Sequence, residues 1–263
     1  MIDSHCHLND ERFDSDRDEV INRAREKGVS LIINIGSGYG FEGNLKSIQI
    51  ARENAGYIYA TVGIHPHDAK LFNNDIERKL RKLIEENRDI IVGIGEIGLD
   101  YHYNFSDPVV QQEVFRKMLY LARDYDLPVV IHSREAGDDT FRILGEGKNN
   151  LRGVMHCFSG DRDEALRYIE ELGFYISISG VVTFKNALKT VEVVKAVPLE
   201  WLFAETDSPY LTPAPYRGKR NEPSFVEYVY RKIAEIKEEN IENVERIIDS
   251  NINRLFSTLT SPE

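Results

Sequence analysis

Eight short runs of apolar and β-branched residues recur along the chain, and segments with helix-like spacing lie between them. The runs are almost continuously hydrophobic, which is typical of parallel strands that helices cover on both faces. Strand–helix alternation repeated eight times within 263 residues predicts a (β/α)₈ TIM barrel. The predicted strands are Met1–Leu8, Ser30–Gly36, Tyr57–His65, Ile90–Leu99, Leu127–His132, Gly153–Phe158, Phe174–Gly180 and Leu202–Asp207.

Helix boundaries agree with this pattern. Asp161 stands where it can cap a helix, with Glu164 three residues later, and Gly173 stands where that helix is expected to end. The main alternative is an open doubly wound sheet, which normally carries a Gly-rich phosphate loop after an early strand. The corresponding turn here is His5-Cys6-His7-Leu8-Asn9, and no linker or charge block divides the chain. We therefore expect residues 1–263 to form a single barrel domain.

Charge and composition restrict the classes of function. Lys and Arg total 33 against 44 Asp and Glu, so the net charge is −11. This balance argues against a protein that coats duplex nucleic acid through bulk charge. It does not argue against an enzyme that holds a nucleic-acid end in a local basic pocket. No apolar run approaches the ~18 residues of a membrane helix, and the polar start has no signal-peptide apolar region. We expect a cytoplasmic protein with no membrane association and no obligate protein partner.

Six side chains that commonly bind metals stand at or near the C-terminal ends of five predicted strands. They are His5, His7, Glu96, His132, His156 and Asp207. In a barrel those ends form one face, which carries the active site. A single histidine at a strand end is usually structural, but four imidazoles and two carboxylates on one spot would be costly without a cation. Mixed histidine and carboxylate ligands suit Zn²⁺, Mn²⁺ or related ions, so we expect two divalent ions (Zn, Mn or Mg) per chain.

Side-chain alternation along the first predicted strand places His5 and His7 on one side and Cys6 on the other. The histidine pair therefore offers two nitrogens to one metal, and Cys6 and Cys157 are expected to be free thiols packed behind the strands. A carboxylate such as Glu96 can bridge two ions. Two ions roughly 3.5–4 Å apart form a clamp for the hydrolysis of phosphoesters and amides. We expect Asp207 to accept the proton of the attacking water as the general base.

The motifs around these residues resemble those of the TatD family, which are metal-dependent, deoxyribonuclease-type hydrolases of the amidohydrolase superfamily. The resemblance runs from Ile2 to Phe256 and keeps the family order. Its motifs are Asp3-Ser4-His5-Cys6-His7-Leu8, Gly63-Ile64-His65-Pro66-His67, Gly95-Glu96-Ile97-Gly98-Leu99-Asp100-Tyr101, Ile131-His132-Ser133-Arg134, His156-Cys157-Phe158-Ser159-Gly160 and Glu205-Thr206-Asp207-Ser208-Pro209-Tyr210.

This resemblance implies a (β/α)₈ barrel with a two-metal centre, and it implies roles for the six ligands. By the family pattern, one ion is held by His5, His7 and Asp207, the other by His132 and His156, and Glu96 bridges them. The resemblance also implies phosphodiester hydrolysis on DNA ends, as some family members perform.

Residues next to the ligands are candidates for binding substrate or orienting ligands. His65 and His67 end the third predicted strand, where either could contact a substrate phosphate or donate a proton; the alternative is a brace for the loop. Glu205 stands two residues before Asp207 and faces the same way, so it can orient a ligand histidine or serve as a buried hydrogen-bond acceptor. Asp100 could shape the pocket or belong to a turn.

A basic segment follows the eighth predicted strand. Arg217, Lys219 and Arg220 lie in Tyr216–Pro223, which resembles the family's Gly-Lys-x-Asn-x-Pro segment. Three cations in four positions of an acidic protein suggest a phosphate-binding loop, and the alternative is ordinary surface charge. Arg134, soon after the fifth predicted strand, is a similar candidate.

The predicted function is divalent-metal-dependent hydrolysis of a phosphodiester at DNA ends, and three alternatives stay open. An amidohydrolase with the same centre could cleave a C–N or C–O bond, as a deaminase or lactonase does. An RNA-linked enzyme could hydrolyse the ester of a mischarged aminoacyl-tRNA. A metal-binding interaction protein has no need of an open two-metal site, which argues against the third alternative.

Overall fold

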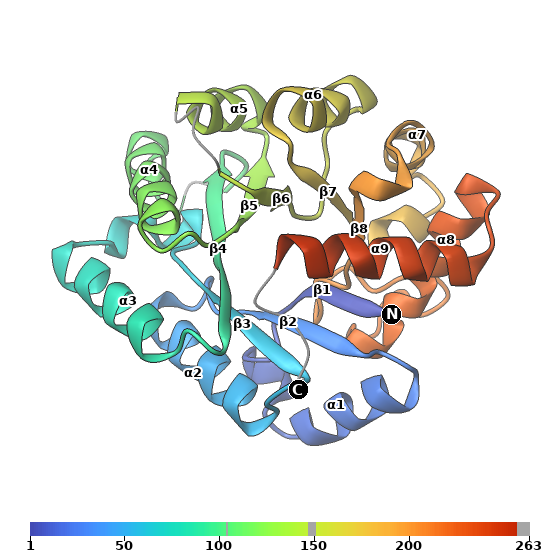
Figure 1. Ribbon diagram of the computed structural model, residues 1–263, viewed down its shortest axis with the longest axis horizontal. Coiled ribbons are helices and arrows are strands. Elements are labelled where there is room, and N and C mark those ends of the chain that lie inside the picture. Colours follow the sequence, from blue (N-terminus) through green and yellow to red (C-terminus); the bar gives the residue numbers. More distant parts are fainter. Residues whose placement is uncertain (104, 147–150, 257–263) are drawn as a thin grey trace.

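The computed structural model describes residues 1–103, 105–146 and 151–256. Within these ranges, eight parallel strands form one sheet in chain order, and Figure 1 shows helices arranged around it. The strands are β1 (Ile2–Cys6), β2 (Leu31–Ile35), β3 (Ile58–Val62), β4 (Ile91–Asp100), β5 (Val129–Arg134), β6 (Gly153–Met155), β7 (Tyr175–Ile178) and β8 (Leu202–Ala204). Each predicted strand is present, and the predicted (β/α)₈ barrel is confirmed.

Hydrogen bonds between the first strand and the segment after the last one close the barrel. The backbone N–H of Asp207 donates to the carbonyl oxygen of His5 at 2.9 Å. The buried carboxylate of Asp3 accepts the backbone N–H of Thr206 at 2.9 Å and its hydroxyl at 2.6 Å. These bonds hold the ligand residues of the first and last strands beside each other.

Helices cover the outer side of the sheet with their apolar faces. In α4, Val114, Met118 and Leu121 are buried together. The side chain of Asp161 accepts the N–H of Glu164 at the start of α6, and Gly173 ends that helix at φ 69°, as predicted. In the described ranges no helix is long and apolar enough to cross a membrane. The helices are α1 (Arg17–Glu26), α2 (Gly40–Glu53), α3 (Asn74–Glu86), α4 (Pro108–Asp124), α5 (Gly137–Glu146), α6 (Arg162–Leu172), α7 (Leu188–Ala196), α8 (Val226–Lys237) and α9 (Ile241–Leu255).

Helix α9 lies at the end of the barrel where the strands begin, and Figure 1 shows it crossing in front of the sheet. Asn251 donates its side-chain N–H groups to the carbonyl oxygens of Leu199 and Leu202, at 2.8 and 3.0 Å, where β8 starts. The buried ring of Phe256 lies 6.4 Å from that of Phe203, centre to centre. Because α9 covers this end, the opposite end, where the strands finish, carries the ligand residues.

The close contact between β4 and β5 depends on a glycine. Gly98 is paired with His132 and has a φ of 139°, a conformation that residues with a side chain rarely adopt. A Cβ atom at this position would lie 2.0 Å from the carbonyl oxygen of His132. The missing side chain therefore lets the two strands approach each other closely, next to Glu96.

We expect Gly98→Ala to lower the free energy of unfolding by more than about 2 kcal/mol, because the added methyl group overlaps the β5 backbone and the φ is strained. The matched control is Gly145→Ala in α5, where a Cβ atom would meet nothing within 4 Å. Alanine is favoured there by about 0.5–1 kcal/mol. Urea and thermal unfolding of both variants measure the difference. A Gly98→Ala protein as stable as the wild type would contradict the close approach of the strands.

Candidate metal centre

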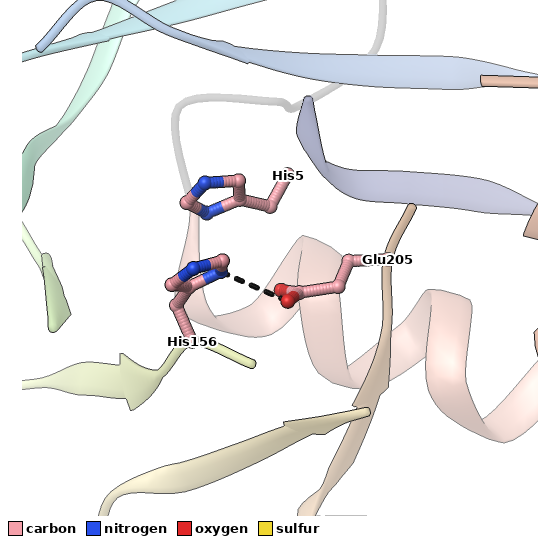
Figure 2. Close-up of side chains that lie close together, drawn as sticks. All are labelled: His5, His156 and Glu205. Carbon is pink, nitrogen blue, oxygen red and sulfur yellow. Dashed lines mark ion pairs between the residues drawn. The ribbon is translucent and has the colours of Figure 1, made fainter. Parts of the chain in front are cut away.

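The six predicted ligand residues converge where the strands end. His5, Glu96 and His132 belong to β1, β4 and β5. His7 and His156 directly follow β1 and β6, and Asp207 lies three residues after the end of β8. Their side chains are between 1% and 17% exposed. Figure 2 shows His5 beside His156, and their rings stack with 3.6 Å between centres. Ionisable groups buried to this extent require paired charges or a metal.

Four donor atoms face one another near the end of β1. The Nε2 atoms of His5 and His7 are 3.2 Å apart. Glu96 Oε2 lies 3.6 Å from the first nitrogen and 3.9 Å from the second, and Asp207 Oδ1 lies 3.7 and 3.4 Å from them. Ligand atoms of a tetrahedral Zn²⁺ ion lie roughly 3.3–3.6 Å apart. These spacings and this mixed nitrogen and oxygen set fit a divalent cation.

The other carboxylate oxygen of Glu96 faces a second set of imidazoles. Oε1 lies 2.7 Å from His132 Nδ1, 3.4 Å from His156 Nε2 and 3.6 Å from His65 Nε2. Burial raises the pKa of Glu96, but the surrounding imidazoles, His156 foremost, outweigh burial and hold this pKa well below its usual range. Glu96 is therefore ionised and offers one oxygen to each set, as a bridging ligand must.

Two carboxylates contact the nitrogens of the second set that face away from Glu96. His156 Nδ1 lies 2.8 Å from Glu205 Oε1, as Figure 2 shows, and His132 Nε2 lies 3.1 Å from Asp100 Oδ2. Burial lowers both imidazole pKa values, yet the neighbouring carboxylates outweigh it and raise the pKa of His132 to about 9 and that of His156 to about 10. A carboxylate behind a metal-binding histidine fixes its tautomer and ring orientation.

Glu205 is itself held in place by two hydrogen bonds. Its Oε1 accepts the backbone N–H of Cys157 at 2.8 Å, and its Oε2 accepts the hydroxyl of Ser177 at 2.6 Å. Asp100 has the same relation to His132, although the sequence left its role open. The alternation along β4 carries a signal for it, because Asp100 lies four residues after Glu96 and on the same side of the strand.

The two thiols are free, as predicted, but only one of them packs behind the sheet. Cys6 is fully buried, with its sulfur 3.9 Å from Asn34 Oδ1. Cys157 instead lines the cavity of the site, and its sulfur lies 3.2 Å from the hydroxyl of Ser179. The expectation for Cys157 was wrong because the backbone turns to φ 42° there, which ends the alternation of an extended strand.

The two histidines after β3 differ in their contacts. His65 Nδ1 accepts the backbone N–H of His67 at 3.2 Å, so in the neutral ring the proton is on Nε2, which points toward Glu96. With this tautomer His65 is a hydrogen-bond donor to the site, and its side chain also lies with Glu96 and His132 in a group whose spacing could hold an ion. His67 Nε2 lies 2.9 Å from Asp100 Oδ2, a contact that braces the loop. Both rings also line the cavity.

A cavity of about 560 Å³ lies in front of the ligand atoms. Pockets of this size bind small organic molecules. Arg134 lines the cavity and, in the part of the chain that the structure describes, is the only Lys or Arg to do so. Its guanidinium lies 4.9 Å from the centre of the Tyr103 ring. Tyr39, Tyr103 and Tyr210 also line the cavity. Tyr210 ends one of the family motifs, whereas none of the quoted motifs includes Tyr39 or Tyr103.

Lys219 and Arg220 do not line this cavity. The guanidinium of Arg220 pairs with both carboxylate oxygens of Asp16, at 2.8 and 2.6 Å, so its charge is already balanced. Lys219 is exposed, with its ammonium group 5.5 Å from the ring of Tyr216. This geometry corrects the expectation that the two cations lie in the substrate pocket. A charged segment after a strand does not by itself determine where its side chains point.

Comparison with known proteins agrees with the fold and with the family resemblance of the motifs. A family model described as TatD related DNase matches residues 2–257. The chain belongs to this family. The Bacillus subtilis protein YabD, named as an uncharacterized metal-dependent hydrolase, is 42% identical over 257 residues, which cover 97% of this chain and 98% of the relative. The 3'-5' ssDNA/RNA exonuclease TatD of Cronobacter sakazakii is 36% identical over 268 residues and is matched over the full length of both chains.

Solved structures agree with this membership. The TatD homolog YJJV from Escherichia coli superposes with a TM-score of 0.90 at 30% identity, over 98% of each chain. This member of the TatD-related DNase family is thus a metal-dependent hydrolase. Family membership excludes the alternative of an interaction protein without catalysis.

We expect Asp100→Asn to weaken divalent-ion affinity by about 10- to 100-fold, because the amide no longer holds the His132 ring with a negative charge. The matched control is Asp139→Asn, which loses an ion pair with Arg142 but contacts no predicted ligand. Calorimetric titration with Zn²⁺ or Mn²⁺ gives both affinities. Equal ion binding by the Asp100→Asn protein and the wild type would show that Asp100 only supports the loop.

Proposed function

We propose that the protein is a two-metal phosphodiesterase that hydrolyses nucleic-acid ends. The observation that carries this proposal is the position of Glu96. Its Oε2 faces His5 and His7 while its Oε1 faces His132 and His156, so one carboxylate joins two sets of ligands. Two-metal centres that share a bridging ligand are suited to in-line displacement at phosphorus.

The ligand sets divide the two ions between them. His5, His7 and Asp207 would hold one ion, and His132 and His156 the other, with Glu96 shared. Four imidazole nitrogens fit Zn²⁺ or Mn²⁺ better than Mg²⁺, which prefers oxygen ligands. Two such ions would lower the pKa of the attacking water and place positive charge next to the phosphoryl oxygens.

Three protein groups perform the remaining chemistry in this proposal. Asp207 is 14% exposed at its side chain and lines the cavity, so its carboxylate can take the proton of the attacking water. His65 directs its Nε2–H toward the site and can donate a hydrogen bond to a substrate oxygen. Arg134 brings a fixed positive charge to the cavity wall, where it can bind a phosphate next to the scissile one.

The nucleic-acid substrate rests on the relatives. The Cronobacter sakazakii relative is named as a 3'-5' ssDNA/RNA exonuclease, and it matches this chain over its full length. Hydrolysis of a C–N or C–O bond, including the ester of an aminoacyl-tRNA, is a second candidate. One observation favours it, because the cavity has a single Lys or Arg among the described lining residues and includes Val181 and Leu211. A panel of single-stranded DNA, duplex DNA, RNA, a lactone and a dipeptide distinguishes these substrates.

We expect Asp207→Asn to lower kcat by about 100- to 10,000-fold, because an amide cannot accept the proton of the attacking water. The effect should exceed that of Glu205→Gln, which acts only through the orientation of His156. Hydrolysis of a short single-stranded oligonucleotide with added Mn²⁺ gives the rates, and elemental analysis reports whether each variant keeps its ions. An Asp207→Asn protein with near-wild-type turnover would mean that another group is the base.

We expect Arg134→Ala to raise KM for the same oligonucleotide by roughly 10- to 150-fold, as the loss of one charge-assisted contact does. Lys219→Ala is the matched control, because this cation lies outside the cavity. If Lys219→Ala raises KM as much as Arg134→Ala, the basic segment reaches the substrate after all.

A further inference from the structure

Two aromatic rings stand exposed at the rim of the cavity. Tyr103 is 41% exposed and Phe105 is 54% exposed. The rings lie 5.5 Å apart, centre to centre, with an angle of 17° between their planes. Tyr103 also lines the cavity that contains the ligand atoms. We call this pair the aromatic ledge. Neither ring belongs to the buried core, although both lie edge-on to His67, with ring centres 5.5 and 4.9 Å away.

Several contacts hold the residues between the end of β4 and Tyr103. Asp100 Oδ1 accepts the backbone N–H groups of His102 and Tyr103, at 3.0 and 2.9 Å. His102 Nδ1 lies 2.7 Å from Glu135 Oε1, which ties the loop to the segment after β5. The other oxygen of Asp100 faces His132 Nε2 at 3.1 Å. A single carboxylate therefore sets the position of Tyr103 relative to the second set of imidazoles.

The net charge of the protein indicates why uncharged contacts such as the aromatic ledge would help to bind a nucleic-acid strand. The chain has a net charge of −11, and Arg134 is the one Lys or Arg that lines the cavity within the described ranges. A polyanionic strand therefore meets few cations and an unfavourable overall field. Contacts without charge must contribute to binding. Stacking of a base on an aromatic side chain strengthens binding by about 5- to 150-fold and tolerates any sequence.

We infer that the aromatic ledge is a stacking subsite for an unpaired nucleobase of the strand whose phosphate enters the metal centre. The inference rests on the proposed function and adds a basis for substrate choice. The Arg134 guanidinium lies over the Tyr103 ring, 4.9 Å from its centre, so the base stacks on the more exposed Phe105 and the guanidinium borders the subsite. A terminal base in a duplex is held by its pairing partner, so the subsite favours single-stranded ends over blunt duplexes, in line with the name of the ssDNA/RNA exonuclease relative.

The test compares two short single-stranded oligonucleotides that differ only in the 3'-terminal residue, which is a nucleotide in one and an abasic residue in the other. For the wild type, we expect removal of the base to lower kcat/KM by about 5- to 150-fold. The double variant Tyr103→Ala with Phe105→Ala should lose a similar factor on the complete oligonucleotide and little more on the abasic one. The swap Tyr103→Phe with Phe105→Tyr keeps both rings and should behave as the wild type.

Tyr120→Ala is the control, because Tyr120 is 57% exposed on α4 and does not line the cavity. The subsite is supported if the wild type cleaves the complete oligonucleotide faster than the abasic one while the ledge variant cleaves the two at similar rates. If the ledge variant discriminates as strongly as the wild type, the subsite is refuted while the phosphodiesterase proposal stands. If the wild type cleaves neither oligonucleotide with Zn²⁺, Mn²⁺ or Mg²⁺, the proposed function fails. In that case fluorescence anisotropy measures the affinity of each protein for labelled forms of both oligonucleotides. The subsite is supported if only the wild type binds the complete oligonucleotide more tightly than the abasic one.

Discussion

The arrangement at the ends of the strands depends on one buried carboxylate. Glu96 is 3% exposed, and imidazole nitrogens surround both of its oxygens. An ion buried in this way costs several kcal/mol unless other charges compensate it. Without ions, protonated His132 and His156 rings, whose pKa values are raised, balance this charge, whereas burial lowers the pKa of His5 and of His65. Divalent cations would take the place of these protons and satisfy the carboxylate and the nitrogens together.

The surrounding fold serves to keep these donors in place. The barrel brings residues from five strands to one end, but it sets backbone positions and not ring orientations. Ring orientation in the second set comes from Asp100 and Glu205, each of which holds a histidine from behind. The position of Asp100 depends in turn on the close approach of β4 and β5 at Gly98. A methyl group added at Gly98, which is not a ligand, is therefore expected to disturb the metal centre through Asp100 and then His132.

Features that follow from a local pattern could be predicted from the sequence. The recurrence and apolar content of the runs predicted the eight strands, and position at the strand ends predicted the six candidate ligands. Features that depend on distant partners could not be predicted in this way. Arg220 pairs with Asp16, which lies 204 residues away, so the charge of its own segment said nothing about its partner. The tautomer of His65 and the turn at Cys157 likewise depend on backbone details of a single residue.

The chemistry of the centre and the choice of substrate belong to different parts of the molecule. A bridged pair of divalent ions can activate water against phosphorus or carbon, so the ligands alone do not select a bond. Selection of the substrate must come from the rim of the cavity. There, within the described residues, Arg134 is the one Lys or Arg that lines the cavity, and the rings of Tyr103 and Phe105 are exposed. Under the proposed function, an acidic protein would gain specificity from this division. Its overall field would discourage polyanions that make only phosphate contacts and favour a strand that also stacks an unpaired base.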